Sequence, residues 1–301
     1  MSSQELALKK KYIGFAGLGD IGSVMASRLV ATGASVIVYN RTASRTEPLV
    51  ALGATVAPRP ADLAQADVVM TCLHGPQSDR EVYEGDGGIL SADVRGKVLI
   101  NTATVGPSAA RRLAGVAEAR GAHYVDAPLL GGGVPAAAVG ELLMPVGASP
   151  TAFELAKPYL DLLASRVEYL GAVGTAQAVK LVNNMQVAVA SAILGDALNL
   201  ALEAGIEKST LARVLPDCSS QSRTSDRHLE TMLFGPLAGR GTLKTLGKDL
   251  ALAVEMCESS GLHSEIAAAA LSYFAGTPWP VDADVPALIE RPQRARAEVA
   301  G

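Results

Sequence analysis

The chain contains 301 residues, of which 49% are hydrophobic and 19% charged, and its net charge at pH 7 is −4. This length exceeds the size at which a single hydrophobic core usually stops growing, so we expect two domains. A negative net charge argues against a nucleic acid or an anionic membrane as the main partner, because both attract positively charged surfaces. The three cysteines are scattered, and residues 1–11 lack the apolar run of a signal peptide. We therefore expect a cytoplasmic protein without a disulfide framework.

The first half of the chain alternates between strand-like and helix-like segments. A short apolar run at 12–16 precedes a helical pattern that ends at Gly33, and a second strand follows at 35–40. Strands that alternate with helices predict a doubly wound α/β domain, in which helices cover both faces of a parallel sheet. The further strand-like runs are 67–73, 97–102, 122–128 and 142–147.

The pattern becomes almost wholly helical after about residue 172, which predicts a sheet domain at 1–172 and a helical domain at 173–301. The segment 174–205 reads as one long helix that is apolar around nearly its whole circumference. Several polar residues interrupt it, so we expect no membrane span. Its apolar surface instead suggests burial by a partner subunit, in a homodimer or homotetramer.

A glycine-rich loop lies between the first strand and the first helix. Its G-x-G-x-x-G spacing is typical of dinucleotide-binding loops when it occupies this position. The first glycine permits a tight turn, the second lets the backbone approach a pyrophosphate, and the third lets helix and strand pack closely. A glycine-rich turn without a ligand is the alternative. The residues predicted to contact the cofactor here are Gly17, Leu18, Gly19, Asp20, Ile21 and Gly22.

The second strand ends in Asn40, Arg41 and Thr42. An NAD site usually has an acidic residue here that accepts a hydrogen bond from the ribose 2′-hydroxyl. Asn40 does not repel a 2′-phosphate and Arg41 can pair with one, so the sequence favours NADP, with NAD as a possible substitute. Alternatively, Arg41 is a solvated loop residue without a ligand.

Lys180 stands in the first half of the long apolar helix, with Asn183 and Asn184 on the same helix face. Burial would lower the pKa of a lysine toward the range of an acid–base catalyst, and a nearby amide can hold a substrate hydroxyl or carboxylate. A lysine that extends its amine to the surface is the other interpretation. The helix alone does not separate the two.

Six segments occur in the order and at about the spacing found in one enzyme family. They are GLGDIGSVMASRLVATG, NRT, NTATVGP, DAPLLGGG, GTAQAVKLVNNM and GKDLALA. In these segments the chain resembles the β-hydroxyacid dehydrogenase family, which includes 3-hydroxyisobutyrate dehydrogenase, tartronate semialdehyde reductase and plant-type glyoxylate reductases. The resemblance extends over about residues 12–275. It implies a Rossmann-type domain, a long interdomain helix and an all-α C-terminal domain.

The resemblance also implies roles for individual residues. Lys180 matches the catalytic lysine and Asn184 the substrate-orienting asparagine. Thr104 matches a threonine near the nicotinamide ribose, Lys248 a lysine that reaches the cofactor, and Leu73 lies in a loop that passes the pyrophosphate. The implied reaction is hydride transfer between nicotinamide and C3 of a small 3-hydroxy acid, with Lys180 exchanging the hydroxyl proton. No metal is expected, because the four histidines lack ligand spacing.

Two departures from the family pattern affect the predicted substrate site. Leu130 replaces a serine that faces the substrate carboxylate in relatives, and an extra glycine follows in Gly131, Gly132 and Gly133. Gly241 replaces a phenylalanine that often packs near the nicotinamide. These changes predict a reshaped pocket that favours larger or more polar 3-hydroxy acids, such as serine, threonine or threonate. The residues assigned to it are Leu130, Gly131, Gly132, Asn184 and Gly241.

Two other functions are compatible with this architecture. An imine reductase commonly has Asp or Tyr at the position of Lys180, so the lysine argues against that activity. A non-catalytic dinucleotide-binding scaffold tends to lose the lysine, whereas this chain has Lys180, Asn184 and Lys248.

Overall fold

A computed structural model describes residues 12–236, 241–276, 279–280 and 283–291. The chain divides into two compact units, Met1–Lys180 and Leu181–Gly301. The division falls inside the long helix α8 (Thr175–Glu203), whose first turns belong to the first unit. The sequence prediction placed the boundary at residues 172 and 173, just before this helix begins.

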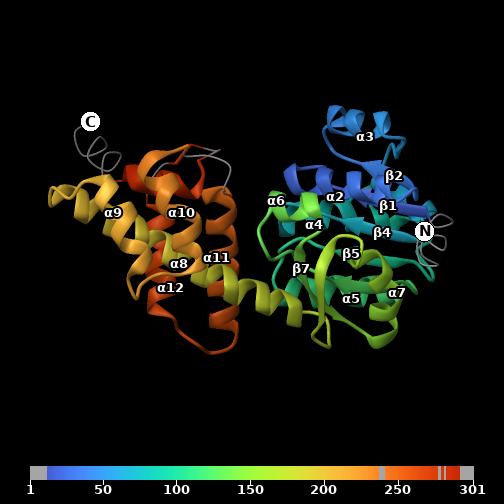
Figure 1. Ribbon diagram of the computed structural model, residues 1–301. Coiled ribbons are helices and arrows are strands. Elements are labelled where there is room, and N and C mark those ends of the chain that lie inside the picture. The colour runs from blue at the N-terminus through green and yellow to red at the C-terminus, as the bar shows by residue number, and fades with distance from the viewer. Residues whose placement is uncertain (1–11, 237–240, 277–278, 281–282, 292–301) are drawn as a thin grey trace. The chain divides into compact units, whose positions relative to one another are not determined.

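The first unit is built on a sheet with helices packed against it (Figure 1). The sheet has eight strands in the order β3-β2-β1-β4-β5-β6-β7-β8. The order reverses at β1, which pairs with β2 on one side and β4 on the other. Ligands of open α/β sheets bind at such a reversal, beyond the carboxyl ends of the strands. The strands are β1 (Tyr12–Ala16), β2 (Ser35–Tyr39), β3 (Thr55–Val56), β4 (Val68–Thr71), β5 (Val98–Asn101), β6 (His123–Asp126), β7 (Leu142–Ala148) and β8 (Ala164–Tyr169).

Helices cover both faces of this sheet, and each face has its own hydrophobic core. In β5, Val98 and Ile100 enter one core and Leu99 enters the other, as the two-residue repeat of a strand requires. The doubly wound architecture predicted from the sequence is therefore confirmed. The helices are α2 (Asp20–Ala31), α3 (Glu47–Ala51), α4 (Pro76–Glu84), α5 (Pro107–Ala119), α6 (Val134–Val139) and α7 (Pro150–Leu160), with 3₁₀ turns at Ala43–Thr46, Pro60–Gln65 and Ile89–Ser91.

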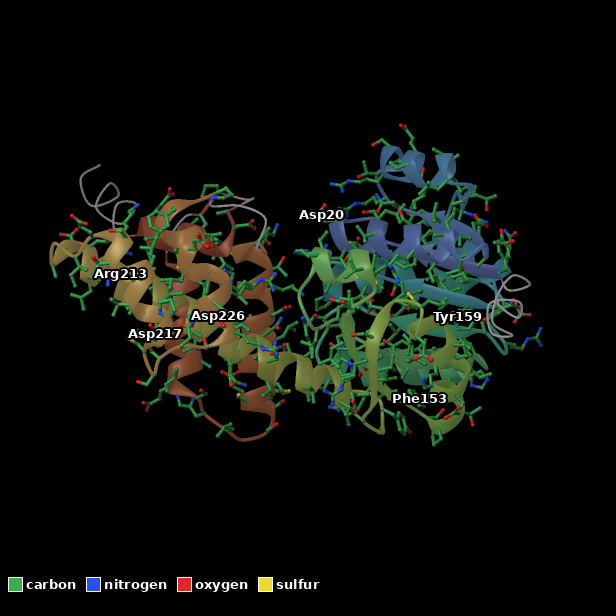
Figure 2. All side chains as sticks on the ribbon, in the orientation of Figure 1. Asp20, Phe153, Tyr159, Arg213, Asp217 and Asp226 are labelled. Carbon is green, nitrogen blue, oxygen red and sulfur yellow. The ribbon has the colours of Figure 1, made fainter. Side chains whose placement is uncertain are left out.

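The sheet departs from the all-parallel prediction at β7, which runs antiparallel to β6. The connection between β6 and β7 contains only the short helix α6. The chain therefore turns back along β6, instead of crossing over the sheet and beginning β7 at the edge where β6 begins. β8 then pairs in parallel with β7 after the crossover through α7. Phe153 of α7, labelled in Figure 2, stacks against Tyr169 of β8, and the ring centres lie 4.6 Å apart. The edge strands β3 and β8 were not predicted.

The second unit is helical, as predicted. Its core combines side chains from α8, α10, α11 and α12, among them Leu198, Leu229, Leu250 and Phe274. Gly195 on α8 lies where a Cβ atom would come within 3.1 Å of Leu288, so a small residue permits this close approach. The elements after α8 are α9 (Lys208–Val214), α10 (Arg223–Phe234), α11 (Leu243–Ser259) and α12 (Glu265–Ala275), with 3₁₀ turns at Leu215–Asp217 and Val285–Glu290.

Within the described ranges, α8 alone is long and apolar enough to cross a membrane, with a mean hydropathy of 1.5. One such helix is weak evidence, because a packed core helix meets the same criterion. Ile193 and Leu200 on this helix are 63% and 73% exposed. The expectation that α8 packs against a partner subunit stays a prediction, as does the absence of a membrane partner.

Candidate active site

The glycine loop after β1 has the shape that a dinucleotide pyrophosphate requires. Gly17 has φ +93°, and a Cβ atom there would overlap the carbonyl of Cys72. A Cβ atom on Gly22 would overlap the carbonyl of Gly17, so α2 and β1 pack with no room for a side chain. At Gly19, no described heavy atom lies within 4 Å of where a Cβ atom would stand. Gly19 is the N-cap residue of α2 and makes no side-chain hydrogen bond to the helix. An anion can therefore approach the backbone amides of the first turn of α2 and bind to them.

Asn40 fastens this loop to the end of β2. Its side-chain oxygen accepts a hydrogen bond from the amide of Leu18 at 2.9 Å, and its side-chain nitrogen donates to the carbonyl of Thr42 at 2.9 Å. The Arg41 side chain is 87% exposed and lies 3.8 Å from the carboxylate of Glu81 on α4. Such an exposed ion pair contributes about 0–1 kcal/mol, so the guanidinium can exchange its partner for a phosphate at little cost.

The neighbouring basic and acidic residues at this edge also pair with each other. Asp20, the first residue of α2 (Figure 2), lies 3.4 Å from Arg45. Asp20 and Arg45 are both exposed, and Arg45 lines a shallow cavity of about 330 Å³. Leu18 also lines this cavity, on the side of the loop that faces the turn after β2.

A buried polar network that the sequence analysis missed lies beneath the loops after β4 and β5. Its centre is Asn101, whose side-chain nitrogen donates to Asp79 at 2.8 Å and to the hydroxyl of Tyr124 at 3.0 Å. The side-chain oxygen of Asn101 accepts from the amide of Ala103 at 2.9 Å and from the hydroxyl of Thr71 at 3.3 Å. Burial raises the pKa of Asp79 to about 7. The network fixes the start of the loop that contains Thr104, one of the predicted cofactor residues.

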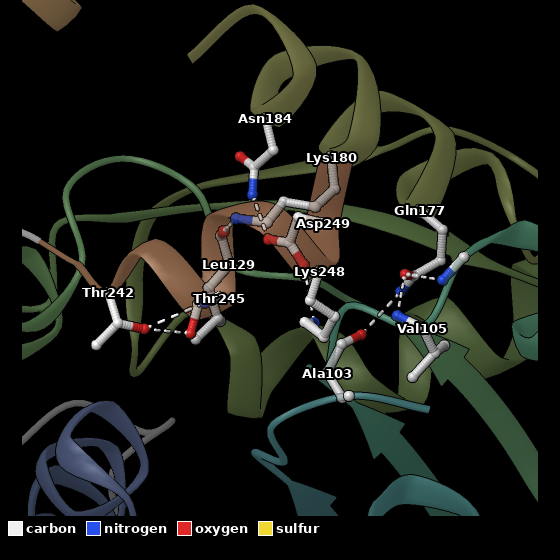
Figure 3. A network of polar contacts seen from close by, with 12 residues as sticks. Ala103, Val105, Leu129, Gln177, Lys180, Asn184, Thr242, Thr245, Lys248 and Asp249 are labelled. Carbon is white, nitrogen blue, oxygen red and sulfur yellow. Dashed lines mark hydrogen bonds and ion pairs between the residues drawn. The ribbon is translucent and has the colours of Figure 1, made fainter. Parts of the chain in front are cut away.

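Lys180 is half-buried, and its amine points at the backbone of the loop after β6 (Figure 3). The Nζ atom donates to the carbonyl of Leu129 at 2.7 Å. Leu130, the next residue and a predicted substrate contact, pairs with Leu143 of β7 through two backbone hydrogen bonds. The structure therefore places the amine of Lys180 beside the predicted substrate loop, within the first unit.

The three glycines that follow Leu130 all adopt positive φ angles. The values are +93° for Gly131, +133° for Gly132 and +68° for Gly133, which caps the short helix α6. Residues with a side chain rarely adopt this backbone. The loop therefore has a shape that depends on glycine at all three positions.

In the second unit, a single buried carboxylate joins two of the predicted site residues. Asp249 is 2% exposed, accepts a hydrogen bond from the side chain of Asn184 at 2.6 Å, and lies 2.8 Å from the Nζ atom of Lys248 (Figure 3). Asn183 donates to the side-chain oxygen of Asn184 at 2.9 Å, which further fixes its orientation. The sequence analysis missed Asp249, although it is the second residue of the quoted K-D-L element.

Gly241 and Leu73, two other predicted residues, have different neighbours. Gly241 has φ +110° and is exposed, and no described atom lies within 4 Å of where its Cβ atom would stand. Its carbonyl accepts a hydrogen bond from the amide of Val285. Leu73 lies next to Gly17, since a side chain on that glycine would meet Leu73 at 2.9 Å. No group of three or more metal-binding side chains occurs among the described residues.

Comparison with known proteins identifies the family of this chain. Residues 12–171 match the family model for the NAD-binding domain of 6-phosphogluconate dehydrogenase. Residues 174–286 match the model for the NAD-binding domain of NADP-dependent 3-hydroxyisobutyrate dehydrogenase. A 2-(hydroxymethyl)glutarate dehydrogenase of Eubacterium barkeri is 32% identical over 88% of each chain. The chain belongs to the β-hydroxyacid dehydrogenase family.

Two further relatives support this assignment. The mitochondrial 3-hydroxyisobutyrate dehydrogenase of Rattus norvegicus is 36% identical over 73% of this chain and 65% of its own length. The 3-hydroxyisobutyrate dehydrogenase of Mycobacterium tuberculosis, solved with L-serine, is 27% identical and superposes with a TM-score of 0.82 over 93% of this chain and 98% of that one. This β-hydroxyacid dehydrogenase is therefore an NAD(P)-dependent enzyme, as the sequence predicted.

The glycine loop yields a test that separates folding from cofactor binding. Gly22→Ala should lower both the melting temperature and the affinity for NADP, because the added Cβ atom pushes α2 away from Gly17. Gly19→Ala should lower the affinity while leaving the melting temperature near that of the wild type. Gly115→Ala is the control, because Gly115 lies on the exposed face of α5 and no described atom lies within 4 Å of its Cβ position. It should lower neither the melting temperature nor the affinity for NADP. Calorimetric titration and thermal melting measure the two quantities. Undiminished NADP affinity in Gly19→Ala would contradict the assignment of this loop.

Proposed function

We propose that this β-hydroxyacid dehydrogenase transfers a hydride between NADP and C3 of a small 3-hydroxy acid, with Lys180 as the general acid and base. The observation that carries the proposal is the position of the Lys180 amine. It is held 2.7 Å from the carbonyl of Leu129, at the start of the glycine-shaped loop, and Asn184 follows one turn later on the same helix. A proton acceptor and an amide are thus presented by consecutive turns of α8.

Each of the proposed site residues has its own role in the reaction. In the direction of oxidation, neutral Lys180 takes the proton of the substrate hydroxyl, and in reduction the ammonium returns it. A neutral amine that donates one N–H to Leu129 keeps its lone pair for this proton. Asn184, fixed by Asp249, holds the substrate hydroxyl or carboxylate. Bound nicotinamide supplies the hydride chemistry, and Thr104 and Lys248 would help to hold it.

The preference for NADP rests on the turn after β2. Both ends of the Asn40 side chain are engaged within the loop, so it offers no carboxylate to a ribose 2′-hydroxyl. Arg41 stands exposed beside it and can pair with a 2′-phosphate. The match of residues 174–286 to a model named for an NADP-dependent enzyme supports the same preference.

The substrate class follows from what the named substrates of the relatives share. 3-Hydroxyisobutyrate, 2-(hydroxymethyl)glutarate and serine, the ligand of the mycobacterial relative, are all 3-hydroxypropanoates that differ in the group on C2. The loop Leu130–Gly133 and Gly241 differ from the usual family pattern, and no atom of the described residues lies within 4 Å of where a Cβ atom on Gly241 would stand. We therefore propose a 3-hydroxy acid whose C2 or C3 substituent is larger or more polar than the methyl of 3-hydroxyisobutyrate.

We also propose a cytoplasmic homodimer or homotetramer, in which exposed apolar residues of α8 contact a second copy of the chain.

The two rival functions predict different activities. An imine reductase would reduce imines and would not need Lys180, and a scaffold would bind NADP without turning over any hydroxy acid. Assays with imines and with hydroxy acids separate the three.

A substrate panel tests the proposed activity and its specificity. Oxidation of 3-hydroxyisobutyrate, glycerate, serine, threonine and threonate would be followed by nicotinamide absorbance with NADP and with NAD. We expect the highest kcat/KM for the larger or more polar acids. Gly241→Phe should reduce activity on those acids most, because its ring adds bulk beside this position, and thermal melting would check that a side chain at φ +110° has not disrupted the local backbone. If 3-hydroxyisobutyrate is the best substrate and Gly241→Phe leaves the order unchanged, the pocket argument is wrong.

Removal of the lysine amine tests the mechanism. Lys180→Ala and Lys180→Met should each lower kcat by about 10²–10⁴-fold, the usual contribution of general acid–base catalysis. The affinity for NADP should stay close to that of the wild type, since the amine contacts Leu129 and not the glycine loop. Asn184→Ala should raise the KM for the acid more than the KM for NADP. A Lys180 variant with wild-type kcat would remove this residue from the mechanism.

Arg41 gives a separate test of cofactor choice. Arg41→Ala should raise the KM for NADP about tenfold or more, because a hydrogen bond to a charged group contributes about 1.5–3 kcal/mol. The KM for NAD should change little. Arg80→Ala removes another exposed arginine from the neighbouring helix α4 and should affect neither value. Equal KM values of the wild type for NAD and NADP would show that Arg41 does not select the cofactor.

A further inference from the structure

Gln177 lies in the first turn of α8 and is completely buried. Its side-chain oxygen accepts hydrogen bonds from the amides of Val105 at 2.9 Å and Gly106 at 3.2 Å. Its side-chain nitrogen donates to the carbonyl of Ala103 at 3.1 Å (Figure 3). These three backbone groups lie on both sides of Thr104. One side chain therefore holds the loop around the residue that is proposed to lie beside the nicotinamide ribose.

The shape of the loop suits a side-chain amide. Gly106 has φ +82° and caps α5, and this turn directs two successive backbone amides toward one oxygen atom. Buried backbone groups almost always have hydrogen-bond partners. An amide side chain combines an oxygen that accepts two hydrogen bonds with a nitrogen that donates. A methionine of similar length would leave the two amides and the carbonyl without this partner.

Gln177 also precedes Lys180 by three residues on the same helix. Residues with this spacing are neighbours on a helix surface, about 4.5 Å apart along its axis. Lys180 donates to Leu129 in the loop after β6, while Gln177 binds the loop after β5. The same turn of α8 is therefore tied to two loops at the carboxyl edge of the sheet.

We infer that Gln177 is a positioning residue for hydride transfer, which fixes the turn that carries Lys180 against the loop that carries Thr104. The inference rests on the proposed function, because it concerns the alignment of the proton acceptor with the cofactor site. A misplacement of about 1 Å between reacting groups can cost about 10²-fold in rate. Loss of the Gln177 contacts should therefore slow the chemical step even where the fold and the cofactor affinity survive.

The test compares Gln177→Met with Gln186→Met. Gln186 is an exposed glutamine on the same helix, and its side chain bonds only locally, to the carbonyl of Val182. Active sites would be counted by NADP titration, and kcat per site and the deuterium isotope effect would be measured with acid labelled at C3. We expect Gln177→Met to lower kcat per site roughly 10–100-fold and to raise the isotope effect, with an NADP affinity within about threefold of wild type. Gln186→Met should match the wild type.

Gln177→Glu keeps an acceptor for the two amides, and the protonated acid, the form that burial favours, can still donate to the Ala103 carbonyl. It should therefore retain more activity than Gln177→Met. A purely structural role would lower the melting temperature but leave kcat per site and the isotope effect unchanged in Gln177→Met, and this result would overturn the inference. If Gln177→Met does not fold, wild-type kcat and isotope effect in Gln177→Asn would overturn it instead, because this amide is one methylene shorter and cannot hold the three backbone groups in the same place. Lys180→Ala in the same assays tests the proposed function separately, because its rate does not depend on whether Gln177 positions anything.

Discussion

The first turn of α8 depends on a buried carboxylate at the end of β6. Asp126 accepts a hydrogen bond from the amide of Gly174, immediately before the helix begins, at 2.7 Å. A carboxylate at this end is favourable, because the N-terminus of a helix carries a partial positive charge. Burial raises the pKa of Asp126 to about 7, and hydrogen bonds from backbone amides oppose that increase. Gly147 leaves room for the carboxylate, since a Cβ atom there would lie 3.1 Å from it. The positions of Gln177 and Lys180 follow from this anchor.

Sequence reasoning was most successful where function imposes a local pattern. The glycine loop could be predicted because each glycine meets a backbone requirement within six residues of chain. The structure shows close contacts at Gly17 and Gly22, and no described atom within 4 Å of a Cβ position at Gly19. The division into a doubly wound sheet and a helical part followed from periodicity. The reversal of β7 could not be predicted in this way, because α6 provides too short a connection for a crossover and periodicity does not encode strand direction.

The polar residues that support the site were harder to predict, because their partners are distant in sequence. Gln177 binds a loop more than 70 residues earlier, and Asn184 binds Asp249 after 65 residues. Asn101 meets Asp79 and Tyr124 only once three separate elements are folded. Each of these side chains looks like an ordinary polar residue within its own segment. Asp249 did carry a signal, because it lies within the K-D-L element, but its link to Asn184 required the structure.

The turn after β2 shows how a structural demand and cofactor choice can coincide. Asn40 accepts a hydrogen bond from the amide of Leu18 and donates one to the carbonyl of Thr42. An aspartate could keep the first bond, but a carboxylate has no hydrogen to donate and would face the Thr42 carbonyl with a like partial charge. The amide therefore stabilises both sides of the turn and leaves the site without the negative charge that would repel a 2′-phosphate. The proposed preference for NADP therefore depends first on the amide of Asn40, which the turn requires for its own hydrogen bonds. The exposed guanidinium of Arg41 adds to this preference.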